Sequence, residues 1–113
     1  MMAKRPGRRG WHDVDKTDIR VSELLQQFLM QQEDRNHSPK TVRWYSDMLG
    51  RFVTSLPTEA RLRDIDAASI RVYLHNNRQN GASKFTLHAY ARTLKTFLRW
   101  LLREGYVDEE LHR

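Results

Sequence analysis

The sequence predicts an all-α domain built from four helices. Apolar residues recur at helical spacing in four segments, and start or stop signals stand at the ends of these segments. No segment alternates polar and apolar residues with the period of two that a half-buried strand requires. The chain has 113 residues, of which 39% are hydrophobic, so we expect one domain with a modest core.

The first helix is predicted over residues 22–35, after a flexible basic tail at residues 1–19. The first ten residues hold four Lys or Arg, one Pro and two Gly without apolar periodicity, which favours a tail. Ser22 is the expected N-cap of the helix. One face of this segment is apolar through Val21, Leu24, Leu25, Phe28 and Leu29.

The second helix is predicted to begin after Ser38, whose hydroxyl can cap the first turn. Pro39 suits the first helical position because the N–H that it lacks would have no partner there. Gly50 weakens the middle of the helix and therefore predicts a close packing contact, and Pro57 stops the helix. Its core stripe is predicted to contain Val42, Tyr45, Leu49, Phe52, Val53 and Leu56.

The third and fourth helices follow a short connecting segment. Asp66 is the expected cap of the third helix, and Gly81 supplies the turn that ends it. The fourth helix is predicted over about residues 83–103, between Ser83 and Gly105. Its core stripe is predicted to contain Leu87, Tyr90, Ala91, Leu94, Leu98, Leu101 and Leu102.

One eight-residue phrase occurs twice, as SPKTVRWY at residues 38–45 and as SKFTLHAY at residues 83–90. Ser, Thr, a branched aliphatic residue and Tyr stand at matching places in both copies. Each copy begins a helix, so capping alone can explain the shared Ser and Thr. The free N–H groups of a helix start also favour phosphate oxygens, and DNA-reading proteins use them in this way.

The positive charge of the chain gathers in the segments that carry the phrase. The net charge is +6, and residues 81–105 contribute +4 of it through five Lys or Arg against one Glu. A solvated face normally mixes charges of both signs, whereas a run without acids favours a polyanion, most often nucleic acid. One face of the fourth helix carries the stripe Lys84, His88, Arg92, Lys95, Arg99 and Arg103, spaced three or four residues apart.

Several classes of function are disfavoured by what the sequence lacks. Without cysteine there can be no disulfide, no thiolate metal ligand and no cysteine nucleophile. The five His residues lack zinc-ligand spacing and no Gly-rich phosphate loop occurs, so we expect neither a metal nor another cofactor. No apolar run is long enough for a membrane span or a secretion signal, which predicts a cytoplasmic protein without membrane contact.

The order of these motifs resembles the N-terminal core-binding domain of tyrosine recombinases, the phage-integrase family. Both stretches that carry the resemblance, HSPKTVRWYSDMLGRFV and LRDIDAASIRVYLHNNRQNGASKFTLHAYARTLKTFLRWLLREGYV, lie within residues 20–107. The family pattern is matched by Ser38, Thr41, Tyr45, Phe52, Gly81, Ser83, Thr86, Leu94, Phe97, Trp100, Leu101, Glu104 and Gly105.

The resemblance implies a compact, SAM-like four-helix domain of two crossed helix pairs. Such a domain positions the recombinase on double-stranded DNA at its core site, with the second and fourth helices facing the major groove. We therefore expect mainly phosphate contacts from Ser38, Thr41, Arg43, Ser83 and Lys84, and base contacts from His88, Arg92 and Lys95. The full set of expected DNA-binding residues is Ser38, Lys40, Thr41, Arg43, Trp44, Ser83, Lys84, Thr86, His88, Arg92 and Lys95.

The resemblance also implies what this chain does not do alone. The catalytic residues of the family lie in a C-terminal domain, so we expect residues 108–113 to begin a linker to a catalytic domain of a parent recombinase. No catalytic residue is expected within the chain itself. The first helix would contact neighbouring protomers on DNA, and the domain would be monomeric without DNA. Two other readings remain open: a stand-alone helical DNA-binding factor, and a helical bundle that binds an acidic protein.

Overall fold

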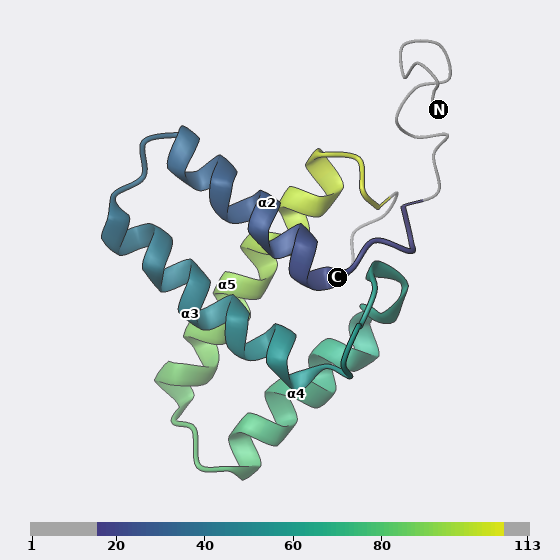
Figure 1. Cartoon of the computed structure of the whole chain (residues 1–113). Coiled ribbons are helices and arrows are strands. Elements are labelled where there is room, and N and C mark those ends of the chain that lie inside the picture. The colour runs from purple at the N-terminus through teal and green to yellow at the C-terminus, as the bar shows by residue number, and fades with distance from the viewer. Residues whose placement is uncertain (1–15, 108–113) are drawn as a thin grey trace.

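Four α-helices account for most of residues 16–107, the part of the chain that this computed structural model describes (Figure 1). The all-α, four-helix fold class is therefore confirmed. The two ranges that the sequence predicted, 22–35 and about 83–103, lie within one residue of the observed helices. The helices are α2 (Val21–Asp34), α3 (Pro39–Ser55), α4 (Ala67–Gln79) and α5 (Lys84–Arg103), with a 3-10 turn, η2 (Leu62–Asp64), before α4.

The helices form two hairpins that cross each other. α2 packs along α3, and α5 passes behind both of them in Figure 1. α3 and α4 each pack on α5. The start of α5 and the start of α3 lie toward the same side of the view in Figure 1.

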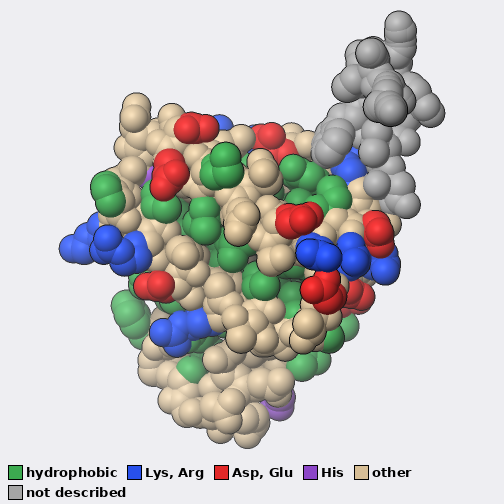
Figure 2. Space-filling model, viewed as in Figure 1, with side chains coloured by type: hydrophobic (Ala, Val, Ile, Leu, Met, Phe, Trp, Pro, Cys, Tyr) green, Lys and Arg blue, Asp and Glu red, His purple; other side chains and the backbone are tan. Residues whose placement is uncertain are grey.

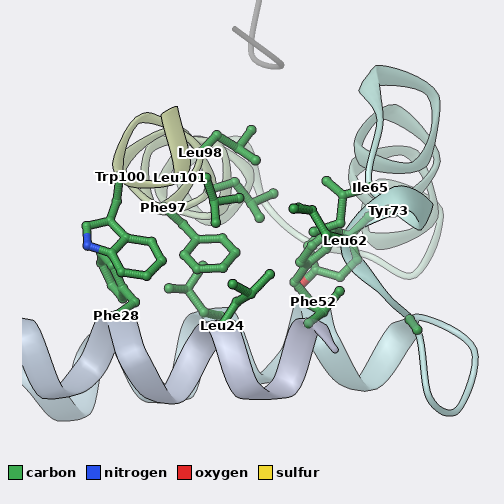
Figure 3. Close-up of a cluster of buried hydrophobic side chains, with 14 of the residues drawn as sticks. Leu24, Phe28, Phe52, Leu62, Ile65, Tyr73, Phe97, Leu98, Trp100 and Leu101 are labelled. Carbon is green, nitrogen blue, oxygen red and sulfur yellow. The ribbon is translucent and has the colours of Figure 1, made fainter. Parts of the chain in front are cut away.

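An aromatic cluster lies where the two hairpins cross, and Phe28 of α2 contacts three other rings in it. Figure 3 shows Phe28 next to Trp100 and Phe97. The Phe28 ring meets Tyr45 of α3 edge-on, with ring centroids 5.3 Å apart, and meets Phe97 and Trp100 of α5 edge-on at 5.5 Å each. Edge-to-face aromatic pairs each contribute about 0.5–1.5 kcal/mol beyond the burial of their area. This cluster therefore fixes how α5 lies across α2 and α3.

The start of α2 differs from the sequence prediction, because Ser22 is not its cap. Arg20 occupies the N-cap position and makes no side-chain capping bond, while Ser22 is exposed inside the helix. The backbone of the preceding residues is instead bonded to the connection before α4. Ile19 accepts a hydrogen bond from the Leu62 N–H at 2.8 Å, and the Val21 N–H donates to the Ala60 carbonyl at 2.9 Å. Long-range backbone pairing therefore fixes this helix start.

The last residues of the segment assigned to the tail contact the folded body. Lys16 is buried, Ile19 packs partly against the core, and the Arg63 N–H donates to the Thr17 carbonyl at 3.0 Å. Residues 1–15 of the predicted tail and residues 108–113 of the predicted linker lie outside the described residues.

The close packing contact expected at Gly50 is not found. A Cβ atom at this position would meet nothing within 4 Å, so the glycine does not permit a close helix contact. Gly81 and Gly105 do have the predicted role at helix ends, with φ of 95° and 83° that other residues rarely adopt. No helix in the described part of the chain combines the length and the apolar character that crossing a bilayer requires.

Candidate nucleic-acid interface

The two copies of the repeated phrase form two helix starts with the same geometry. At α3, the Ser38 Oγ accepts a hydrogen bond from the Thr41 N–H at 3.1 Å and donates to the Thr41 Oγ1 at 3.0 Å. At α5, Ser83 and Thr86 repeat both bonds at 3.1 Å. The shared Ser and Thr therefore cap both helices in the same way, as the sequence predicted.

Both helix starts leave the positive end of the helix dipole without an acid to compensate it. α2 has Glu23 in its first turn, whereas the first turns of α3 and α5 contain no acidic residue. Ser38 and Ser83 are exposed, so an anion can approach either end from solvent. A negative group near a helix start is stabilised by about 0.3–1 kcal/mol at an exposed site. Both ends are thus suited to phosphate groups.

The cationic stripe of α5 is exposed along its whole length. Its opposite face is buried against the core through Tyr90, Leu94, Phe97 and Leu101, which turns the stripe outward. No member of the stripe forms an ion pair with any acid among residues 16–107, whereas Arg20, Arg61 and Arg63 each do. The exposed members are Lys84, His88, Arg92, Lys95, Arg99 and Arg103.

The core side of α5 differs from the predicted stripe at several positions, because Phe97 and Trp100 are buried although the stripe did not include them. Ala91 is exposed, and Ala89 is buried in its place. Thr93 is also buried, and its hydroxyl donates to the Ala89 carbonyl at 2.8 Å, so this polar group is satisfied within the helix.

The start of α3 offers a second, smaller basic face. Lys40 and Arg43 are exposed there, Thr41 is half-buried, and the Trp44 side chain is 44% exposed. Figure 2 shows Lys and Arg side chains projecting at the edge where α3 begins, while acidic side chains gather over the end of α2 and over the connection before α4. The expected DNA-binding residues all lie at the surface, and only Thr41 and Thr86 among them are half-buried.

One exposed residue at this surface was missed by the sequence reasoning. Phe85, at the second position of α5, is 83% exposed and is the most exposed large hydrophobic residue among those described. The sequence held a signal for it, because Phe85 precedes Leu87 by two residues. Two residues turn a helix by about 200°, so Phe85 must lie opposite the core stripe.

A pocket of about 720 Å³ lies between α3 and α4, away from the two capped starts. Arg51, Val72 and Asn76 line it together with Tyr73, whose hydroxyl is buried and has no hydrogen-bond partner within residues 16–107. Burial raises the pKa of Tyr73, and the nearby Tyr90 raises it further. The Asn77 side chain and Arg51 lower this pKa, but by less than the first two effects raise it. None of the expected DNA-binding residues lines this pocket.

Within residues 16–107, no group of three or more His, Cys, Asp or Glu side chains is placed to hold a metal ion.

The comparison with known families matches residues 24–105 to the family described as phage integrase, N-terminal SAM-like domain. The chain belongs to this family. The matched residues run from within α2 to the glycine that closes α5, so they contain both capped helix starts. The resemblance seen in the sequence is therefore confirmed.

A curated relative of this integrase domain is the tyrosine recombinase XerC of Oceanobacillus iheyensis, strain HTE831. It is 30% identical over 79 residues, which are 68% of this chain and 26% of the relative. The chain thus spans about a quarter of the length of that recombinase. No solved structure matched the chain significantly.

Proposed function

We propose that this integrase N-terminal domain binds double-stranded DNA and positions a tyrosine recombinase on its core site. The observation that carries this proposal is the exposed cationic stripe of α5, which forms no ion pair with an acid among residues 16–107 and begins at a helix start without acidic compensation. A DNA duplex carries one negative charge for roughly every 1.7 Å of its axis, so a stripe of this kind suits it. In this proposal α3 and α5 face the major groove.

The proposed phosphate and base contacts follow from the position of each residue along its helix. Ser38, Thr41 and Arg43 contact phosphates at the start of α3, with Lys40 and Trp44 beside them. Ser83, Lys84 and Thr86 do the same at the start of α5. His88, Arg92 and Lys95 lie further along α5 and reach toward the base edges. An Arg bound bidentately to guanine contributes about 1–3 kcal/mol of discrimination.

The proposal extends to residues beyond the two helices. The DNA-binding domain comprises residues 20–107 together with residues 16–19, which contact its folded body. The preceding residues form a basic tail, and residues 108–113 begin a linker to the catalytic domain of the parent recombinase. The domain is monomeric without DNA, and α2 contacts neighbouring protomers on DNA. Met30 of α2 is 55% exposed, while Leu25 and Leu29 beside it are partly buried in the core, so Met30 is the best-placed of the three for such a contact.

Salt dependence of binding is the direct test. Arg92→Ala and Lys95→Ala, singly and together, are titrated against labelled duplex at several salt concentrations. Each lost phosphate contact lowers the slope of log K against log salt by roughly 0.9, so the double variant should lose up to about twice that. If either residue contacts a base and not a phosphate, its removal should lower the affinity with a smaller change in the salt slope.

Arg71→Ala is the matched control, since it removes one exposed positive charge from α4, outside the proposed interface. It should leave the slope close to that of the wild type. If Arg92→Ala and Lys95→Ala behave as this control does, then neither residue contacts the DNA backbone.

Trp44 fluorescence separates a DNA interface from a bundle that binds an acidic protein. Trp44 is partly exposed at the start of α3, whereas Trp100 is 2% exposed, so added duplex should change the emission of Trp44. Trp44→Phe is the control, because it removes the contribution of Trp44 and leaves only the background emission of Trp11 and Trp100. Emission that stays constant with duplex but responds to an acidic polypeptide would favour the protein-binding reading.

A further inference from the structure

We propose that Phe85 recognises thymine, by packing its ring against the C5-methyl group of a thymine in the major groove. This inference rests on the DNA-binding function proposed above and adds to it a base preference and the residue that provides it.

The exposure of Phe85 is the first observation. Phe28, Phe52 and Phe97 are at most 1% exposed and form the core, whereas Phe85 is 83% exposed. Burial of a Phe side chain normally stabilises a fold, and the folded domain gains almost none of this stabilisation at Phe85. The ring is therefore available to an external apolar group.

The position of Phe85 restricts what that group can be. Side chains on a helix tilt toward its N-terminus, so the ring lies beside the first turn of α5, next to the cap formed by Ser83 and Thr86. His88 and Arg92 follow three and seven residues later and lie on the same exposed side of the helix. The ring thus stands where the cationic stripe meets the uncompensated helix start.

A polyanion that covers this stripe would bring its own groups against the ring. Phosphates and sugars are polar, so on DNA the complementary apolar group is the thymine methyl, which only the major groove displays. Uracil lacks this methyl group, and the major groove of an RNA duplex is too narrow for side chains to read. Phe85 therefore favours A·T pairs of DNA at the position that it contacts.

The two copies of the repeated phrase differ at this position. Phe85 corresponds to Lys40 at the start of α3, which is exposed and charged. Two helix starts with the same cap thus present different groups, an ammonium on α3 and an aromatic ring on α5. The methyl preference should accordingly come from α5 alone.

The test compares two duplexes that differ only in the methyl group. One is an alternating A·T duplex, and the other has the same sequence with deoxyuridine in place of thymidine. Their affinities for the whole chain are measured by fluorescence anisotropy at low ionic strength, where phosphate contacts are strongest. The wild type should bind the thymidine duplex roughly three- to fivefold more tightly for each methyl group covered.

Phe85→Ala should lower this ratio to about one. Val72→Ala is the matched control, because Val72 is 56% exposed on α4, and it should keep the wild-type ratio. Circular dichroism checks that both variants remain helical.

Each other outcome overturns the inference in a recognisable way. Equal affinity of the wild type for both duplexes removes thymine recognition and leaves DNA binding in place. A preference that survives in Phe85→Ala assigns the methyl contact to another residue. If the wild type binds neither duplex, the proposed function fails together with the inference.

Discussion

Trp100 of α5 donates its indole N–H to the side-chain oxygen of Gln31 on α2, over 2.7 Å. The indole is 2% exposed, lies edge-on to Phe28 and is stacked on Phe97. It also meets the Tyr106 ring at 5.3 Å, just beyond the end of α5. This single bond therefore satisfies the one polar atom of a large buried ring and joins the last turns of α5 to α2.

Gln31→Ala should destabilise the domain by about 1–3 kcal/mol, because it leaves the buried indole N–H without an acceptor. Urea unfolding followed by circular dichroism measures the change. Gln27→Ala, at an exposed position of the same helix, is the control and should change stability by less than about 0.5 kcal/mol. Equal losses in the two variants would mean that water replaces Gln31 at the indole.

Removal of either serine cap should lower the free energy of unfolding by about 1 kcal/mol. Ser38→Ala and Ser83→Ala each delete the acceptor of an N–H in the first turn of a helix, so thermal unfolding should shift downward in both. Ser22→Ala serves as the control, since Ser22 lies inside α2 and caps nothing. A cost at Ser22 as large as at the other two serines would contradict the assignment of the caps.

Sequence reasoning located features that depend on neighbouring residues. The caps of α3, α4 and α5 follow from local chemistry, since Ser38, Asp66 and Ser83 bond to an N–H only three residues ahead. The cap of α2 was predicted wrongly at Ser22, because this helix start depends on backbone bonds to the segment 60–62, about forty residues away. The Gln31–Trp100 bond spans 69 residues and has no local signal.

The candidate interface was predictable for a related reason. The cationic stripe of α5 repeats at helical spacing, so its exposure follows once the leucine face is buried. Phe85 was missed because an apolar residue is expected in the core, and only its angular distance from Leu87 indicates otherwise. Gly50 was misread because a helical glycine can reflect either close packing or open space, and the sequence does not distinguish them.

Substitutions at two glycines should have opposite effects on stability. Gly50→Ala should stabilise the domain by about 0.5–1 kcal/mol, because it improves helix propensity where the new Cβ meets nothing within 4 Å. Gly81→Ala should destabilise it by about 1 kcal/mol or more, since φ of 95° strains any residue with a Cβ. Urea unfolding of both variants measures the two signs. A loss of stability in Gly50→Ala would show that α3 needs flexibility at this point.

Tyr73→Phe should leave the free energy of unfolding unchanged or raise it by up to about 1 kcal/mol at neutral pH. The Tyr73 hydroxyl is buried without a partner, and its removal ends the cost of burying it. The ring contact with Phe52, at 5.2 Å, remains in the variant. Tyr73→Leu removes that contact as well, and should be clearly less stable than Tyr73→Phe. A loss above about 1 kcal/mol in Tyr73→Phe would show that the hydroxyl has a hydrogen-bond partner.

The same hydroxyl should make the domain sensitive to alkaline pH. Burial raises the pKa of Tyr73 above its ordinary value of 10.0, so the folded state holds this proton more tightly than the unfolded chain does. The protonated Tyr73 hydroxyl therefore contributes its full share of stability below pH 10, the pKa in the unfolded chain. This contribution is lost as the pH rises through the raised pKa of the folded state. Burial and Glu104 raise the pKa of Tyr106 as well, so it adds to the loss. Urea unfolding between pH 8 and pH 11, values that bracket the ordinary tyrosine pKa of about 10, should show a smaller decline in Tyr73→Phe than in the wild type. Equal declines would place the alkaline sensitivity at other groups.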